Sequence, residues 1–242
     1  MSVKKAKVIT ITSVKGGTGK STFTLNLAGA LSKKQIKTII IDLDLSAGVI
    51  KASLNILSNS DIYTLTEDMA NGRYKNLEDY VKKYNEYIDI IPSTNDPRNA
   101  LKIYPGYVEN LIKQLEYKYD VILIDTPHTH NSLNLTAFDI STNIYYIITD
   151  DLMDLKNMKT IISIYEDMNL NNYKIILNKS LIKSIGNYEV KTILEKDVDY
   201  IIPKEFYEKN IQKYIYEGKI LTLEKSIKKT KIFDEIAEDI TK

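Results

Sequence analysis

Short apolar runs alternate with amphipathic segments along almost the whole chain. Runs rich in β-branched residues predict strands, and they occur at 7–12, 37–44, 87–92, 120–127, 143–149, 173–178 and 199–203. Apolar residues at helical spacing predict helices, directly after residue 20 and over 104–117, 152–165 and 232–240. Residues 46–85 are less regular, and there we expect short helices within 54–65 and one helix over 76–84.

This alternation predicts an α/β fold, a mostly parallel twisted sheet with helices on both faces. A chain of 242 residues with 43% hydrophobic content fits one such domain. No repeat, low-complexity tract or linker interrupts the pattern, so we expect a single domain over residues 1–242.

A glycine-rich stretch, residues 13–21 with the sequence SVKGGTGKS, lies between the first strand and the first helix. Glycines let a backbone bend with positive φ and approach an anion closely. Successive amides and the helix N-terminus then surround phosphate groups with partial positive charge. In this pattern Lys20 reaches the β- and γ-phosphates and the Ser21 hydroxyl holds Mg²⁺. The sequence therefore predicts a P-loop that binds nucleotide through Lys15, Gly16, Gly17, Thr18, Gly19, Lys20, Ser21 and Thr22.

Three aspartates follow predicted strands, Asp42 and Asp44 after the second and Asp125 after the run at 120–124. Ligands of open parallel sheets bind outside the carboxyl ends of the strands, where the glycine-rich loop must also lie. Asp125 follows four apolar residues, which is the Walker B arrangement, and we expect it to hold Mg²⁺ through water. Turn or helix-capping aspartates without chemistry are the alternative for all three.

A second lysine, Lys15, lies inside the loop, where an ordinary Walker A loop needs none. The form KGGTGKS resembles the deviant Walker A loop of the ParA/MinD family of dimerising ATPases. The resemblance implies that Lys15 crosses to the partner subunit and contacts the phosphates of its nucleotide, as an arginine finger does. A lysine that merely faces solvent is the alternative.

The same resemblance implies roles for the aspartates of the second strand. Asp44 would lie in a switch loop and position the attacking water, which makes it a catalytic residue together with Lys15 and Lys20. Asp42 would support Mg²⁺, alongside Ser21 and Asp125, or the lysine network. Phosphoryl transfer depends mostly on positioning and charge neutralisation, so we do not expect Asp44 to be a strong general base.

Two later positions bear on the choice of base. After a late strand the chain reads Asn178-Lys179-Ser180-Leu181, without the aspartate by which common GTPases recognise guanine. An asparagine amide can pair with adenine in bidentate fashion, and Pro203 resembles the proline of the family's adenine pocket. We therefore expect ATP and Mg²⁺ as cofactors. A strand-end turn residue is the alternative for Asn178.

Composition narrows the remaining chemistry. The formal net charge is +1, so any contact with nucleic acid must come from a local patch. There is no cysteine, which excludes disulfides, Cys-ligated zinc and thiolate-held iron–sulfur clusters. The two histidines, His128 and His130, follow Asp125. We interpret them as part of a switch loop; a metal-binding pair is the alternative, but no third ligand is suggested nearby.

The family divides by cargo, and on this point the sequence says less. Lysines cluster before the last predicted helix and would provide salt-dependent DNA contacts, although a solvated face is the alternative: Lys225, Lys228, Lys229 and Lys231. The last helix is acidic on its polar side, unlike a basic membrane-surface helix, so we expect no direct membrane anchor. No signal peptide or membrane span is apparent, which predicts a cytoplasmic protein, associated with the nucleoid if it binds DNA.

The favoured hypothesis is a ParA-like partitioning ATPase. It would form an ATP-dependent homodimer, bind non-specific DNA and respond to a ParB-like activator protein. A MinD-like or flagellar-placement switch that positions a protein complex is the alternative. A metabolic ligase of the same fold and a tyrosine kinase of the related bacterial type are less favoured, because no second-substrate motif and no C-terminal tyrosine cluster are apparent.

Overall fold

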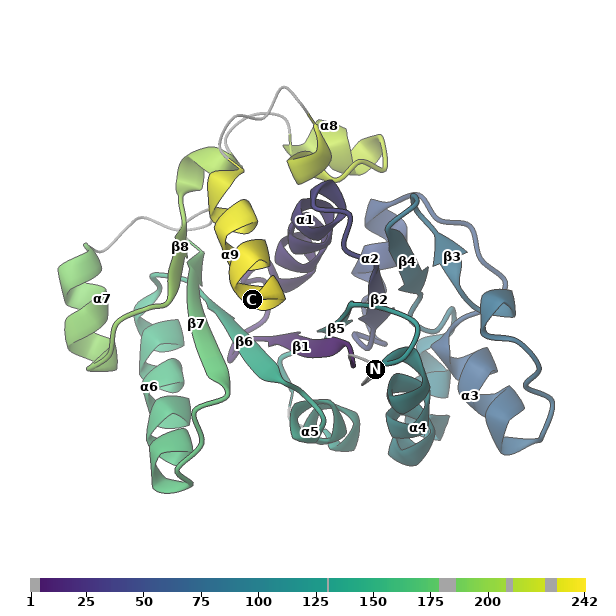
Figure 1. Cartoon of the computed structure of the whole chain (residues 1–242). Helices are drawn as coiled ribbons and strands as arrows, with labels where there is room; N and C mark the ends of the chain where they lie inside the picture. The colour runs from purple at the N-terminus through teal and green to yellow at the C-terminus, as the bar shows by residue number, and fades with distance from the viewer. Residues whose placement is uncertain (1–4, 130, 179–185, 208–210, 225–229) are drawn as a thin grey trace.

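A computed structural model describes residues 5–129, 131–178, 186–207, 211–224 and 230–242 (Figure 1). The described residues form one sheet of eight strands in the order β3-β4-β2-β5-β1-β6-β7-β8. Neighbouring strands are parallel except for the edge pair β3–β4. The strands are β1 (Lys7–Thr12), β2 (Thr38–Asp42), β3 (Lys82–Lys83), β4 (Ile88–Ile91), β5 (Val121–Asp125), β6 (Asn143–Ile148), β7 (Tyr173–Asn178) and β8 (Tyr200–Ile202).

Helices cover both faces of this sheet, as Figure 1 shows. The helices are α1 (Lys20–Lys33), α2 (Val49–Ser53), α3 (Ile62–Ala70), α4 (Pro105–Leu115), α5 (Ser132–Asp139), α6 (Leu152–Asp167), α7 (Asn187–Leu194), α8 (Ile211–Tyr216) and α9 (Lys231–Thr241). Short 3₁₀ helices add η1 (Leu77–Asp79), η2 (Pro97–Lys102), η3 (Lys204–Phe206) and η4 (Leu221–Leu223). The predicted α/β class, with one mostly parallel sheet between helical layers, is confirmed.

Alternation along the strands divides the core between the two faces. On one face α1 and α9 pack on residues such as Ile9 and Ile40, while their sequence neighbours Val8 and Ile39 meet the helices of the other face. Every residue of β2 and β5 is buried, because both strands lie inside the sheet and under both layers. This explains why their sequences are continuous apolar runs rather than alternating ones.

Helix α1 is held from outside by residues far along the chain. The Thr222 amide donates to Asn26 Oδ1 at 3.1 Å, and the Thr222 hydroxyl donates to the Asn26 carbonyl at 2.8 Å. A Cβ on Gly29 would lie 2.2 Å from Thr222 Oγ1, so only glycine allows this approach. Further along, Phe233 of α9 packs on Phe23 with 5.6 Å between ring centroids. The apolar side of α9 is thus buried in the core.

The structure corrects some element predictions. The helix expected over 76–84 is wrong: it is the single turn η1 followed by β3, whose Lys82 and Lys83 pair antiparallel with β4. The short helices expected within 54–65 are instead α2, which ends at Ser53, and α3, which begins at Ile62. Strand β2 ends at Asp42, so Asp44 lies in the following loop. Within the described ranges, no helix is long and apolar enough to cross a membrane.

Candidate nucleotide site

The glycine-rich loop connects β1 to α1 as predicted. Gly17 and Gly19 have φ values of 77° and 92°, a region that favours glycine, and Gly19 directly precedes the first residue of α1. The Ser13 hydroxyl donates to the Lys15 carbonyl at 2.6 Å, and Lys20 Nζ donates to Ser13 Oγ at 3.1 Å. The buried Lys20 ammonium therefore lies under the loop, next to the start of the helix. This arrangement is suited to hold phosphate groups.

A cavity of about 540 Å³ opens beside this loop. Its polar wall comes from the loop and the start of α1, and its apolar wall from the segments around α2 and α8. The lining residues are Gly17, Gly19, Lys20, Ser21, Thr22, Asp44, Ala47, Val49, Asn178, Tyr207, Ile211, Gln212 and Ile215. One polar and one apolar wall, at this volume, suit a ligand with a phosphate end and an apolar end.

The apolar wall was not predicted from the sequence. Tyr207 is partly buried, and burial raises the pKa of its hydroxyl while the neighbouring Asn178 side chain lowers it. Ile211 and Ile215 are one helical turn apart on α8. Their i, i+4 spacing is a signal that could have indicated a helix here. Pro203, which we expected to line the pocket of the adenine base, precedes η3 and is not among the residues that line the cavity.

Asn178 supports the phosphate loop as well as lining the cavity. Its side-chain Nδ2 donates to the Thr18 carbonyl at 2.9 Å. The contact is so close that a Cβ on Gly19 would lie 2.6 Å from this nitrogen. The residue is almost fully buried at the end of β7. Asn178 therefore fixes the loop's shape, a role that sequence reasoning did not assign to it.

Two of the predicted metal-binding carboxylates are neighbours on adjacent strands. Asp42 and Asp125 pair in register across β2 and β5, and neither has any exposed surface. The Ser21 hydroxyl donates to Asp125 Oδ2 at 2.5 Å, and the Thr24 hydroxyl donates to Asp125 Oδ1 at 3.2 Å. Ser21 and Asp125, predicted to share one ion, are thus in direct contact.

The burial of this pair changes its proton affinity. Burial raises the pKa of Asp125 to about 6, although the Ser21 hydrogen bond and the Lys20 charge hold it down. The pKa of Asp42 lies well above its usual range, first because of burial and then because of the charges of Asp125 and Asp44. Asp42 Oδ2 has no hydrogen bond of normal geometry, although the Ser93 hydroxyl lies beside it. Two buried carboxylates on adjacent strands, one with an oxygen that lacks a hydrogen bond, lie beside the Ser21 hydroxyl. This donor set fits Mg²⁺, which prefers oxygen ligands.

Asp44 occupies a different position from Asp42. Its amide donates to Asp42 Oδ1 at 3.1 Å, and its carbonyl accepts from the Gly48 amide at 3.1 Å. The side chain is partly exposed and lines the cavity. Asp42 therefore lies beneath the site, whereas Asp44 lies on its wall. From there the Asp44 carboxylate can reach a water molecule next to a phosphate.

Lys15 lies outside its own cavity. Its Nζ is 3.2 Å from Asp151 Oδ1, and its side chain is 45% exposed. Asp151 caps α6 by accepting from the amides of Met153 and Asp154, each at 3.1 Å. The pKa of Asp151 is lowered by the Asp154 amide and by the hydrogen bond to Lys15. In the single chain the ammonium of Lys15 is therefore tied to a helix start rather than aimed at the phosphate position.

The remaining predicted residues lie at the edges of the site or beyond it. His128 lies against the loop, since a Cβ on Gly16 would be 3.5 Å from its ring. His130 and Lys225, Lys228 and Lys229 are outside the described residues. Lys231, at the start of α9, forms a 3.5 Å ion pair with Glu235. In the part of the chain that the structure describes, no three His, Cys, Asp or Glu side chains group to hold a metal by themselves.

Comparisons with known proteins agree with this geometry. A family model described as an AAA domain matches residues 6–183. The septum site-determining protein MinD of Thermotoga maritima is 27% identical over 205 residues, which cover 81% of this chain and 74% of that protein.

Solved structures give the same result over nearly the whole length. A ParA family ATPase from Chlorobium tepidum matches with a TM-score of 0.85 at 21% identity, over 97% of this chain and 98% of that one. MinD of Pyrococcus horikoshii, solved as a complex with Mg-ADP, matches with a TM-score of 0.81 at 26% identity, over 98% of this chain and 96% of that one.

Proposed function

The chain belongs to the ParA/MinD family of ATPases with a deviant Walker A loop, and we propose that it binds and hydrolyses ATP as a homodimer. Its cavity supports ATP binding, because a buried lysine and positive-φ glycines lie at one end and apolar side chains at the other. Loop amides and Lys20 would hold the phosphates. Tyr207 and Ile211 would contact the base, next to Asn178.

Residues on the polar wall account for the ion. The Ser21 hydroxyl and the carboxylate of Asp125 would hold Mg²⁺, with Asp42 beneath them. The ion supplies charge neutralisation at the β- and γ-phosphates. The protein's own part is to hold the Ser21 hydroxyl against Asp125, with Asp42 beside it on the neighbouring strand. Asp44, on the cavity wall, would orient the attacking water.

The position of Lys15 carries the dimer proposal. A lysine that assisted its own nucleotide would lie on the cavity wall, whereas Lys15 is absent from that lining and partly exposed. A second copy facing the loop could receive this side chain at its phosphates, as the family resemblance implies.

Light scattering tests this point. The wild-type protein should form a dimer with Mg-ATP and not with Mg-ADP, and Lys15→Ala should stay monomeric with both nucleotides. Lys156→Ala, which removes an exposed lysine of α6, is the matched control and should still dimerise. A dimer of the Lys15→Ala protein as stable as that of wild type would refute the role in trans.

We further propose that the ATP dimer binds non-specific DNA and takes part in plasmid or chromosome partitioning with a ParB-like activator. The support is the lysine cluster Lys225, Lys228, Lys229 and Lys231 in the sequence. The test is DNA binding with ATP and with ADP at several salt concentrations. ATP-dependent, salt-sensitive binding that Lys225→Ala/Lys228→Ala/Lys229→Ala removes supports the proposal. No DNA binding by a proven ATP dimer contradicts it.

A MinD-like switch that positions a protein complex is the second candidate. It is favoured by the two MinD proteins, which are 26% and 27% identical to most of this chain. The apolar side of α9 is buried on α1, so this helix does not offer an apolar face to a membrane. Sedimentation of the ATP dimer with lipid vesicles, without DNA binding, would favour this candidate.

A further inference from the structure

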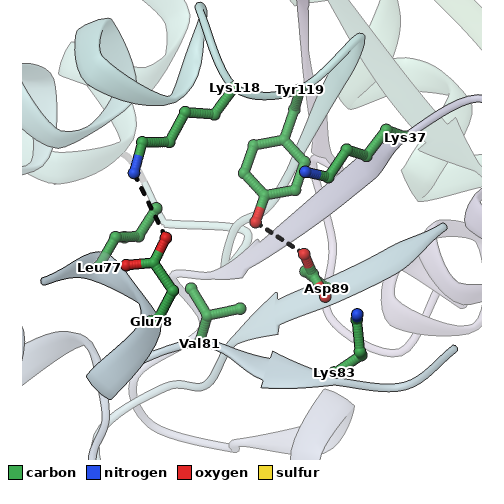
Figure 2. Close-up of a pocket in the computed structure, with 8 residues that line it drawn as sticks. All are labelled: Lys37, Leu77, Glu78, Val81, Lys83, Asp89, Lys118 and Tyr119. Carbon is green, nitrogen blue, oxygen red and sulfur yellow. Dashed lines mark hydrogen bonds and ion pairs between the residues drawn. The ribbon is translucent and has the colours of Figure 1, made fainter. Parts of the chain in front are cut away.

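A second cavity lies at the opposite edge of the sheet from the phosphate loop (Figure 2). Its volume is about 580 Å³. It lies where β2 and β5 begin, so both strands run from this cavity to the carboxylates Asp42 and Asp125. The lining residues are Lys37, Leu77, Glu78, Val81, Lys83, Asp89, Lys118 and Tyr119. None of these residues belongs to the nucleotide site.

Three ammonium groups surround this cavity, and they come from separate segments. Lys37 precedes β2, Lys83 lies on β3 and Lys118 precedes β5. Among the described residues, no carboxylate lies within 4.0 Å of the ammonium of Lys37 or Lys83. Lys118 is 3.5 Å from Glu78, whose side chain is 74% exposed. The cavity thus holds positive charge that its own acids neutralise only in part.

Asp89, a second carboxylate of the cavity, accepts a hydrogen bond from a tyrosine and forms no ion pair with the lysines among the described residues. The Tyr119 hydroxyl donates to Asp89 Oδ2 at 2.8 Å, as Figure 2 shows. Burial and this bond raise the pKa of Tyr119, so the hydroxyl keeps its proton and stays a donor. Lys83 is directly opposite Asp89 in the β3–β4 pair, yet the two side chains do not form an ion pair.

Hydrogen bonds fix the backbone from which the exposed Lys37 side chain extends. The Lys37 amide donates to Asp120 Oδ2 at 2.9 Å, and the Asp120 amide donates to the Lys37 carbonyl at 2.8 Å. The Lys37 ammonium lies 4.9 Å from the centre of the Tyr119 ring, which is itself buried. A cation on an aromatic face is attracted to it and keeps its N–H donors for a ligand.

We propose that this cavity binds a small anion that carries two or more phosphate or carboxylate groups. Lys37, Lys83 and Lys118 would each donate to it, while Leu77 and Val81 form the apolar floor. Charge-assisted bonds from ammonium to phosphate or carboxylate are the strong class of hydrogen bond. The volume is that of an ordinary small-molecule site. This site is independent of the ATPase proposal.

Residue-resolved NMR of the full ¹⁵N-labelled chain tests the proposal, with pyrophosphate and citrate as separate probes in Mg²⁺-free buffer. We expect saturable shifts of the amides of Lys37, Lys118 and Tyr119, with a dissociation constant of about 1 mM or tighter for at least one probe. A response to pyrophosphate alone indicates a phosphorylated ligand, and a response to citrate alone indicates a polycarboxylate. Shifts of residues 13–21 report the phosphate loop separately.

A matched pair of double variants provides the control. Lys37→Ala/Lys83→Ala should weaken the response of Lys118 and Tyr119 at least about tenfold. Lys113→Ala/Lys156→Ala removes the same charge from the surface of α4 and α6 and should leave the response of Lys118 and Tyr119 unchanged. An unaltered ADP response of residues 13–21 shows that each variant is folded. Binding weaker than about 1 mM for both probes, or equal loss in both double variants, overturns the proposal.

Discussion

Replacing Asp125 by asparagine should stabilise the free protein while it removes a residue assigned to the Mg²⁺ site. Asp125 is fully buried next to Asp42, and its pKa is raised from 3.8 to about 6. At neutral pH the folded protein must therefore keep the carboxylate ionised against its environment. Asparagine has the same shape and no charge, and it can still accept the hydrogen bond from Ser21.

The expected gain follows from the pKa. A rise from 3.8 to about 6 corresponds to about 3 kcal/mol of folding stability lost at neutral pH. Because the folded state binds this proton more tightly than the unfolded state, wild-type stability increases as the pH falls through 6. At pH 5 the folded wild type has recovered about 1 kcal/mol of this cost. The difference in folding stability between Asp125→Asn and wild type should therefore decrease by the same amount.

Urea unfolding, followed by circular dichroism at pH 7.5 and pH 5, measures this difference. The exposed Asp139 provides a control, since Asp139→Asn should change stability little at either pH. Mg-ATP should then reverse the order, because a ligand that binds only the folded state adds about 4.1 kcal/mol at 1,000 times its dissociation constant, which exceeds the cost of about 3 kcal/mol. The variant should gain much less from Mg-ATP than wild type.

The reasoning about the buried carboxylates is refuted by either of two results. One is an Asp125→Asn protein that is less stable than wild type in the absence of nucleotide at pH 7.5. The other is a stability difference between the two proteins that does not change between pH 7.5 and pH 5.

Three further changes probe the site and its support. Asp151→Asn keeps the α6 cap but removes the charge that holds Lys15, so the ATP dimer should tighten by no more than about fivefold, and only at low salt; weaker dimerisation in light scattering contradicts this. Gly29→Ala forces a Cβ to within 2.2 Å of Thr222 Oγ1 and should cost about 1–3 kcal/mol; an unchanged thermal midpoint argues against the close packing. Asp44→Asn should retain the ATP dimer while phosphate release stops, and normal turnover would remove Asp44 from catalysis.

The sheet and the phosphate loop could be predicted because their signals are local. Strand β5 was expected at 120–127 and occupies Val121–Asp125, since a fully buried parallel strand has to be apolar throughout. The prediction of a helix over 76–84 was wrong for a physical reason. Leu77, Tyr80, Val81 and Tyr84 have helical spacing, yet residues 82–83 pair with β4, a tertiary contact that local spacing does not reveal.

The parts of the site that the sequence did not reveal depend on which elements are neighbours. The sequence predicted Asp42 and Asp125 at one edge of the sheet but not as direct neighbours. They are neighbours because β2 lies next to β5, although 83 positions separate them. Lys15 reaches Asp151 because β6, which leads into α6, lies beside β1. The apolar cavity wall with Tyr207 comes from a segment near α8, a helix of six residues that is too short to show a clear helical period.

The packing of α1 against residues from the end of the chain has a consequence for biosynthesis. Asn26 and Thr222 are separated by 196 positions in the sequence, and Phe23 and Phe233 by a similar number. A ribosome adds roughly 5–20 residues per second, so the helix that starts at the phosphate loop lacks its outer packing for about ten seconds or longer. A half-translated subunit should therefore be unable to capture nucleotide, which keeps incomplete polypeptides from competing with finished ones for a partner.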